Sequence, residues 1–324
     1  MKRRLMFLAL ATIGLASCNG FKKGDGGMLY SIVTDKGNPR IMPGDFIALN
    51  VTLKTDADSL LGSTYESGRP YMNFMQKPQA KGDIYAAFEK LGEGDSAVIK
   101  LNIDSLSKGH PRPAGMKGKY QVYYVKVEKV IQKGNLSAEV FKGRYMAYVN
   151  QLGDAAKKQE PVKVKKYIAD NNLKVTTTAS GLDYVVTTPG SGPNPVNGDT
   201  VVVSYIGKFL NGKVFDTSIK TEAVKAKLQI NPMNPYKPIH FALGTPGMIK
   251  GWNEGLLLLN KGTKATFILP SSLAYGEQGG GQIGPYTPLV FELELVDIIH
   301  PNPNAPKPAA PKPLAQVPPQ PVRK

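Results

Sequence analysis

The residues of this chain that could do chemistry do not form a common catalytic or cofactor motif. The segment GKFLNGKV (207–214) is one residue short of a phosphate-binding loop, and Val214 stands where Ser or Thr would hold magnesium. No helical pattern follows the glycine-rich segment GEQGGGQIG, which argues against a dinucleotide loop. The three histidines are too few and too dispersed for a metal site, and no Gly-x-Ser-x-Gly is present. The sequence therefore predicts no metal and no cofactor, and hydrolysis is unsupported.

One tryptophan is the remaining focus. Trp252 is the only tryptophan in 324 residues and lies in FALGTPGMIKGWNEG, ahead of four consecutive leucines, Leu256 to Leu259. Taken alone, a tryptophan in such a place is most simply a core residue. A functional interpretation needs other residues at a defined spacing around it.

The elements expected to position these residues are mainly strands. PGDFIALNVTL alternates apolar residues from Ile47 to Leu53, and NGDTVVVSYIG repeats this pattern through Val201, Val203 and Tyr205. Such alternation is typical of a half-buried strand. Asn211-Gly212, between two apolar runs, predicts a two-residue hairpin turn in which both residues have positive φ.

The two strand-rich segments resemble each other. GEGDSAVIKLNI corresponds to NKGTKATFILP, and YYVKVEKVI corresponds to FELELVDII, in the same order along the chain. Gly44 and Gly198 are 154 residues apart, whereas Gly94 and Gly262 are 168 apart. This pattern predicts a duplicated domain whose second copy carries about 14 extra residues, which fits TEAVKAKLQINPMNPYKP.

The second copy, over roughly residues 178–300, resembles the FKBP-type peptidyl-prolyl cis–trans isomerase family. The resemblance rests on SYIGKFLNGKVFDTS, HFALGTPGMIKGWNEGL and LPSSLAYGEQGGGQIGPYTPLVFELEL. It implies an α+β fold in which a twisted antiparallel sheet wraps around one short helix, here beginning near Lys250. It also implies the X–Pro bonds of polypeptides as substrate.

The resemblance implies a role for each residue that matches the family pattern. Asp216 and Tyr275 are the expected catalytic residues; Asp216 either supports the twisted amide or fixes Tyr205. Substrate carbonyls would accept hydrogen bonds from the Ile249 N–H and the Tyr275 hydroxyl. The expected substrate-binding residues are Tyr205, Phe215, Phe241, Met248, Ile249, Trp252, Ile283 and Phe291.

The first copy lacks this set of residues. Aligned by its flanks, it is predicted to be an FKBP-like domain without isomerase activity, which binds a partner or spaces the second domain from a membrane. An unrelated strand-rich domain is the alternative. The residues aligned with Tyr205, Phe215-Asp216, Trp252 and Tyr275 are Val51, Tyr65-Glu66, Ile84 and Lys108.

A helical linker is predicted between the copies. Phe141, Tyr145, Tyr148 and Leu152 have helical spacing, and Pro161 is expected to interrupt that helix. A short second helix would end near Asn171 and Asn172, with a left-handed cap. The linker is expected to pack against one domain, with a helix-mediated dimer as the alternative.

The start of the chain resembles a bacterial lipoprotein signal. A basic start and an apolar stretch too short for a membrane span precede Leu15-Ala16-Ser17-Cys18, which resembles a lipobox. The resemblance implies a lipidated Cys18, the only cysteine, and a tether at the outer membrane facing the periplasm. A chance cysteine behind an ordinary signal peptide is the alternative.

These observations predict six segments. They are a signal peptide (1–17), a tether (18–27), a degenerate FKBP-like domain (28–132), a helical linker (133–172), an isomerase domain (173–300) and a proline-rich tail (301–324). His300 to Lys324 holds nine prolines in 25 residues, which favours an extended spacer or docking tail. The net charge of +16 is spread along the chain, which fits anionic lipid, an acidic partner or solubility better than nucleic acid.

The sequence leaves two functions open. The first is a lipid-anchored isomerase that assists the folding of exported proteins containing X–Pro bonds. The second is a non-catalytic holdase or an accessory subunit of an outer-membrane secretion or assembly complex.

Overall fold

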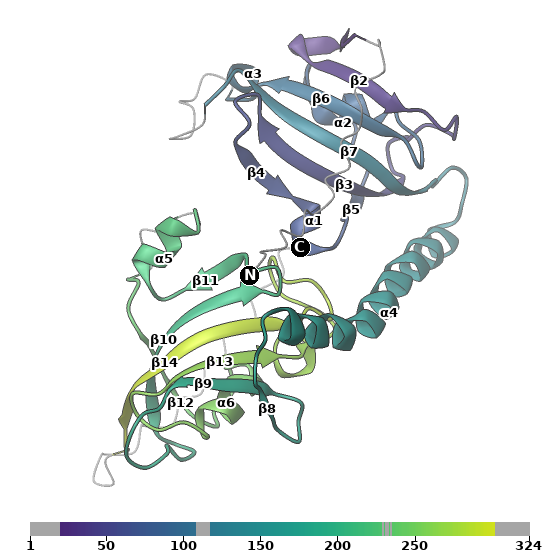
Figure 1. Cartoon of the computed structure of the whole chain (residues 1–324). Coiled ribbons are helices and arrows are strands. Elements are labelled where there is room, and N and C mark those ends of the chain that lie inside the picture. The colour runs from purple at the N-terminus through teal and green to yellow at the C-terminus, as the bar shows by residue number, and fades with distance from the viewer. Residues whose placement is uncertain (1–19, 108–116, 229, 231–232, 234, 302–324) are drawn as a thin grey trace, which may run out of the picture. The chain divides into compact units, whose positions relative to one another are not determined.

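The computed structural model describes residues 20–107, 117–228, 230, 233 and 235–301 (Figure 1). The expected signal peptide, Cys18, Lys108 and nearly all of the proline-rich tail lie outside these residues. By its contacts the chain divides into two compact units. The first runs to Val162 and includes 275–287; the second holds Lys163–Ala274 and the chain from Pro288 onward.

The first unit is built on a seven-stranded antiparallel sheet in the order β1-β2-β6-β7-β3-β4, with β5 also paired to β3 (Figure 1). Both β4 and β5 use the same edge of β3, because β4 pairs with residues 52–54 and β5 with residues 46–49. The strands are β1 (Lys22–Lys23), β2 (Leu29–Thr34), β3 (Phe46–Thr55), β4 (Leu60–Ser63), β5 (Tyr71–Phe74), β6 (Ser96–Asn102) and β7 (Tyr120–Ile131). The helices are η1 (Asp25–Gly27), α1 (Thr64–Ser67), α2 (Ile84–Phe88) and α3 (Ile103–Ser107).

The second unit repeats this topology. Its sheet has the order β11-β10-β14-β13-β9-β8, with β12 paired to the same edge of β10 as β11. The predicted α+β fold with two FKBP-like domains is therefore confirmed. The strands are β8 (Thr176–Thr177), β9 (Asp183–Thr188), β10 (Thr200–Phe209), β11 (Val214–Thr217), β12 (Ile239–Ala242), β13 (Lys264–Leu269) and β14 (Leu289–Ile299). The helices are α5 (Lys220–Lys225), which lies in the extra segment, α6 (Lys250–Leu256) and η2 (Ser271–Leu273).

The alternation predicted from the sequence places alternate residues of β3 and β10 in the two cores. Ile47 and Leu49 are fully buried in the first, and Val201 and Val203 in the second. Helix α6 approaches its sheet closely at Gly255, where a Cβ would lie 2.4 Å from a ring carbon of Phe267. Any larger residue at 255 would therefore push α6 away from β13.

The hairpin between β10 and β11 differs from the prediction. Only Gly212 has a positive φ there, at 83°, and the Gly212 N–H donates to the Phe209 carbonyl. The pairing also shifts between Gly207 and Lys208, so that Phe215 occupies a β-bulge. The loop is therefore a longer hairpin loop with a left-handed glycine rather than the predicted two-residue turn.

The linker is one continuous helix, α4 (Ala138–Asp170), so the predicted break at Pro161 is wrong. Its first half joins the first core: Phe141 is buried, and Tyr145 stacks on Phe46 at 5.4 Å between ring centroids. Its last turns join the second core, where Val164 packs with Ile268 and Val290. The helix thus packs against both domains rather than one. None of the described helices is long and apolar enough to cross a bilayer.

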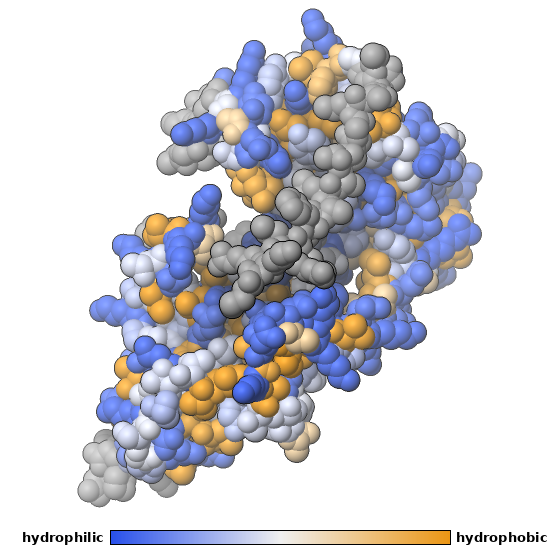
Figure 2. All heavy atoms as spheres, in the orientation of Figure 1, coloured by the Kyte–Doolittle hydropathy of each residue, from blue (hydrophilic) through white to orange (hydrophobic). Residues whose placement is uncertain are grey.

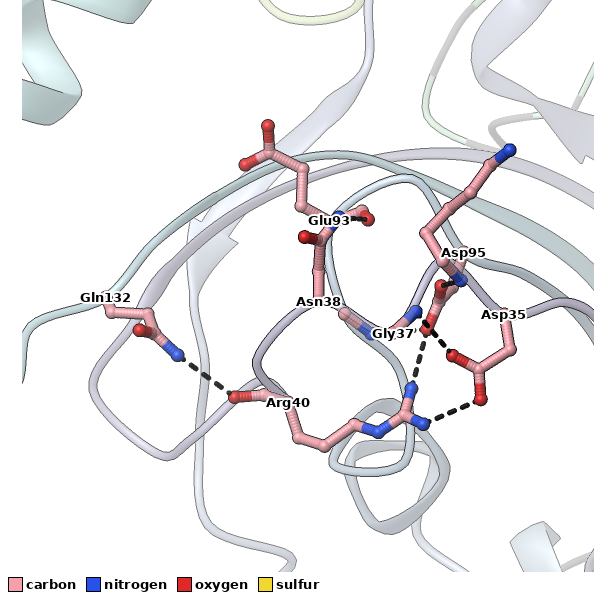
Figure 3. Close-up of polar contacts among 9 residues, drawn as sticks. Asp35, Gly37, Asn38, Arg40, Glu93, Asp95 and Gln132 are labelled. Carbon is pink, nitrogen blue, oxygen red and sulfur yellow. Dashed lines mark hydrogen bonds and ion pairs between the residues drawn. The ribbon is translucent and has the colours of Figure 1, made fainter.

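A buried carboxylate fastens the loop after β2 in the first unit (Figure 3). Asp95 is fully buried and accepts hydrogen bonds from the N–H groups of Lys36 (2.7 Å) and Gly92 (2.8 Å). The Arg40 guanidinium bridges Asp95 and the exposed Asp35, at 2.7 Å from each. The hydrogen bond from Arg40 holds the pKa of Asp35 below its usual value. Asp95 is therefore the central acceptor of this clamp.

Candidate functional site

Aromatic side chains from four strands and one helix meet around Trp252 in the second unit. The centroid of the Trp252 ring lies 5.1 Å from that of Tyr205 and 5.2 Å from that of Phe291, and the ring is edge-on to both. The distance to the Phe241 ring centroid is 6.0 Å. Phe215 completes the group through an edge contact of 5.8 Å with Phe291. The structure thus brings together five of the apolar residues predicted from the sequence.

The indole nitrogen of Trp252 has an unusual environment. Trp252 is 2% exposed, and its Nε1 is buried without a hydrogen-bond partner in the described part of the chain. Leaving a buried N–H unpaired costs about 1–3 kcal/mol, so such groups are rare outside functional sites. The unpaired Nε1 thus distinguishes Trp252 from a core residue whose polar groups are all satisfied.

A tyrosine–aspartate pair forms the polar edge of this aromatic group. The Tyr205 hydroxyl donates to Asp216 Oδ2 at 2.6 Å, while Asp216 Oδ1 accepts from the Thr217 N–H. The backbone of Tyr205 is held from β11: its N–H donates to Ser218 Oγ at 2.9 Å, and its carbonyl accepts from Thr217 Oγ1 at 2.7 Å. The pair orients the Tyr205 ring, which is one of the two roles expected for Asp216.

Thr217 and Ser218 were missed by the sequence analysis. They follow Phe215-Asp216 directly in VFDTS, so the signal was their place beside two site residues at the end of a strand. Hydroxyl side chains at such a position can bond the backbone of the neighbouring strand.

Ile249 and Met248 lie at the entry to α6, and both are half-buried. Ile249 is the N-cap residue of α6, and its carbonyl accepts from the Trp252 N–H. No acceptor for the Ile249 N–H is present among the residues described. This N–H is thus available as a donor, as the resemblance to the family implies.

One wall of the aromatic group depends on a glycine. At Gly207 a Cβ would lie 2.7 Å from the Phe215 ring and 3.0 Å from the Phe291 ring. Because real side chains do not tolerate such contacts, only glycine leaves both rings in place.

Tyr275 and Ile283 are carried by the loop that follows η2. Tyr275 is 41% exposed and Ile283 is buried. The contacts of this loop place it in the first unit. The distances given above are therefore those among residues of the second unit.

The first unit keeps the backbone arrangement of the site without its side chains. The Val51 N–H donates to Thr64 Oγ1 at 2.9 Å, as that of Tyr205 does to Ser218. Thr52 pairs with Ser63 and Leu53 with Gly62, so Leu61-Gly62 occupies the place of Phe215-Asp216. The predicted equivalence of Tyr65-Glu66 with that pair is wrong, because it did not allow for the strand register.

The other equivalent positions follow from the same registers. Ile47 pairs with Asn73 on the neighbouring strand, just as Val201 pairs with Phe241 in the second unit. Likewise, Leu53 pairs with Tyr123, just as Gly207 pairs with Phe291. Tyr123 is half-buried, and this burial raises the pKa of its hydroxyl. The aromatic strand residues of the second unit are thus replaced by Val51, Leu61, Asn73 and Tyr123, while the equivalence of Ile84 with Trp252 stays a prediction.

These features, a duplicated sheet wrapped on a short helix and an aromatic group around a helical tryptophan, define an FKBP-like protein. The family model described as FKBP-type peptidyl-prolyl cis-trans isomerase matches residues 192–296. The chain belongs to this family, because it matches one member over more than two thirds of that member's length. That relative is the FKBP-type 22 kDa peptidyl-prolyl cis-trans isomerase of Escherichia coli, with 34% identity over 48% of this chain and 71% of the relative.

Other similar proteins are matched over only part of their length. The probable FKBP-type peptidyl-prolyl cis-trans isomerase FkpA of Neisseria meningitidis is 42% identical over 44% of this chain, but the match spans only 48% of that relative. The crystal structure of FkpA from Escherichia coli is 31% identical, with a TM-score of 0.40 over 51% of this chain and 74% of that chain.

Proposed function

We propose that this protein is a peptidyl-prolyl cis–trans isomerase whose site is the aromatic group around Trp252. The observation that carries the proposal is the edge-on packing of Tyr205 and Phe291 on a buried Trp252 in the segment that matches the family. No nucleophile is needed for this reaction, since rotation about the X–Pro bond breaks no covalent bond.

The chemistry follows from the apolar surroundings. Rotation about an X–Pro bond faces a barrier of about 20 kcal/mol and takes tens of seconds or longer without catalysis. At the twisted midpoint the amide loses resonance and becomes less polar than the planar ground state. An aromatic pocket without water disfavours the polar ground state and so lowers the barrier. Reaching milliseconds requires roughly 10⁴-fold acceleration, or about 5–6 kcal/mol.

Polar groups would orient the substrate in this pocket. The unpaired Ile249 N–H and the Tyr275 hydroxyl would donate to substrate carbonyls, while Asp216 holds Tyr205 in place. By the resemblance to the family, Met248 and Ile283 would add apolar contacts to the proline ring. Tyr275 would thereby be the catalytic polar residue, and Asp216 the residue that positions Tyr205.

The test is the cis-to-trans isomerisation of a short X–Pro peptide by the purified chain. Wild-type protein should accelerate the reaction, and Trp252→Ala should abolish the acceleration. Ile268→Ala is a matched control, because Ile268 is fully buried in the separate cluster beside Val164. No acceleration by folded wild-type protein would refute the proposal.

We also propose that the isomerase is lipid-anchored through Cys18 at the outer membrane, where it assists exported proteins that contain X–Pro bonds. The lipobox-like LASC and the single cysteine support this location. Labelling of cells with a radioactive fatty acid should mark the wild-type protein and not Cys18→Ser. Labelling of both, or of neither, would contradict a lipid anchor at this cysteine.

A second candidate function is that of a non-catalytic holdase or accessory subunit of an outer-membrane complex. It is favoured by the first unit, which keeps the fold while replacing the aromatic residues of the site. Suppression of aggregation of a proline-free client by Trp252→Ala protein would support this function, and failure to suppress it would count against it.

A further inference from the structure

The loop that carries Tyr275 is held together by its own backbone. The Tyr286 N–H donates to the Gly276 carbonyl at 3.0 Å, which joins the two ends of the segment 275–287. Inside the loop, Gly280 and Ile283 exchange two backbone hydrogen bonds of 2.8 and 2.9 Å. A Cβ at Gly280 would lie 3.0 Å from a ring carbon of Tyr275, so the backbone passes close beside this ring. The direction of the Tyr275 side chain therefore depends on the shape of the whole loop.

Tyr286 has a backbone conformation that is rare for a bulky residue. Its φ is +51°, in the left-handed region that favours glycine. A residue in this region persists only where its surroundings hold it there. The Tyr286 side chain is half-buried, and a hydrogen bond with Glu277, near the other end of the loop, raises the pKa of its hydroxyl. The groups that contact the Tyr286 ring are thus those that hold the loop in this shape.

Two of these groups lie on α4, in the part of the helix that belongs to the same unit as the loop. The Lys157 ammonium lies 5.6 Å from the centroid of the Tyr286 ring and 3.8 Å from Glu277 Oε1. At Gly153, a Cβ would lie 3.6 Å from a carbon of the Tyr286 ring, which is ordinary van der Waals contact. Residues four apart share one face of a helix, so this face of α4 meets the ring over one full turn. We call Gly153, Lys157, Glu277 and Tyr286 the loop anchor.

The loop anchor is open to water, and this decides which of its contacts matter. Figure 2 shows mostly hydrophilic residues along α4, and the side chains of Lys157 and Glu277 are 62% and 66% exposed. An ion pair this exposed contributes little by itself. The contacts of the Tyr286 ring with the ammonium and with the helix therefore carry most of the anchor. Gly153 fits this arrangement, because glycine is unfavourable inside a 33-residue helix and yet keeps the helix surface clear for the ring.

We propose that the loop anchor positions Tyr275 for isomerisation, so that the linker helix α4 controls the catalytic rate. This inference rests on the proposed function, in which the Tyr275 hydroxyl donates to a substrate carbonyl. Release of Tyr286 from α4 frees the loop at the residue that closes it onto Gly276, directly beside Tyr275. Tyr286 and Lys157 are thus positioning residues, which act on the reaction through Tyr275 and not by touching the substrate.

The test compares isomerisation of a short X–Pro peptide by the full purified chain and by variants of the loop anchor. Tyr286→Ala removes both ring contacts and should lower kcat/KM by at least about fivefold, whereas Lys157→Ala should lower it about threefold. Tyr286→Phe keeps the ring on α4 and should react as wild type does. Lys158→Ala is the matched control and should also react as wild type does, since Lys158 is the next residue of α4 and is likewise exposed.

A double variant shows whether the effect passes through Tyr275. If Tyr286 acts only by positioning the Tyr275 hydroxyl, Tyr286→Ala should not slow Tyr275→Phe any further. Multiplied losses in the double variant would overturn the proposal, as would a wild-type rate for Tyr286→Ala. An equal loss in Tyr286→Phe and Tyr286→Ala would also overturn it, because the bond to Glu277 within the loop would then account for the effect.

Hydrogen exchange separates failure of this inference from failure of the proposed function. The amides of residues 276–283 should exchange faster in Tyr286→Ala and Lys157→Ala than in wild type and Lys158→Ala. If the wild-type protein does not accelerate isomerisation, the proposed function fails, but exchange still reports whether α4 holds the loop. Unchanged exchange in Tyr286→Ala would overturn the loop anchor, whatever the activity.

Discussion

Tyr205→Phe and Asp216→Asn separate the two roles considered for the aspartate. The Tyr205 hydroxyl donates to the Asp216 carboxylate at 2.6 Å, and Asp216 is exposed. A hydrogen bond to a charged group is worth about 1.5–3 kcal/mol when protected from water, and solvent screening reduces this one to about 1 kcal/mol. If Asp216 acts only by orienting Tyr205, each variant loses that amount and kcat/KM falls about fivefold.

The double variant gives the decisive comparison. When both partners serve one hydrogen bond, removing the second costs nothing further, so the double variant should also be about fivefold slower than wild type. The assay is cis-to-trans isomerisation of an X–Pro peptide, with thermal melting to confirm that each variant is folded. If instead kcat/KM of the double variant falls about 25-fold, the product of the two single losses, the orienting role is refuted. It would show that Asp216 acts on the twisted amide directly.

Three further predictions concern stability. Trp252→Ala and Ile268→Ala both remove buried side chains and should each cost about 2–5 kcal/mol of unfolding free energy, but only Trp252→Ala should abolish isomerisation; equal loss of activity would contradict this. Asp95→Ala leaves three buried or half-buried donors without this acceptor and should lower the free energy of unfolding in denaturant by about 3 kcal/mol. Asp35→Ala should leave the denaturation midpoint unchanged. Similar midpoints for the two variants would argue against the clamp. Hydrogen bonds from the Val196 N–H and, second, from His300 lower the pKa of Asp199 from its ordinary 3.8, so the stability that Asp199 contributes is present above about pH 4 and lost as the pH falls further. In thermal melts, the melting temperature of Asp199→Asn should therefore decline less below about pH 4 than that of wild type. Identical pH profiles of the two proteins would contradict the assignment.

Much of the site could be predicted because its side chains have distinctive types at a fixed spacing. Tyr205 and Phe291 lie on strands that the apolar pattern also indicates, whereas the helix of Trp252 was implied only by the resemblance to the family. The orphaned Trp252 Nε1 could not be predicted, because it depends on the positions of neighbouring groups in space. The availability of the Ile249 N–H was implied only by the resemblance to the family.

The errors have physical causes. Pro161 was expected to break the linker helix because proline lacks an N–H and crowds the preceding turn. Packing of Phe141 and Tyr145 on one sheet, and of Val164 on the other, instead supports the helix on both sides of it. The equivalence of Leu61 with Phe215 was missed because Leu61-Gly62 shares no side-chain chemistry with Phe215-Asp216, although these residues have the same 154-residue separation as Gly44 and Gly198.

The backbone frame shared by the two units separates folding from chemistry in this protein. The hydroxyl–amide contacts at Val51 and Tyr205 are made in the same way, whatever side chain occupies the site. Mutations in one copy could therefore accumulate without loss of the domain, which leaves the first copy open to a new use. The path is also reversible in principle, since a Cβ added at Gly62 would meet nothing within 4 Å. The first domain is thus a natural scaffold for rebuilding an active site by grafting a small set of side chains.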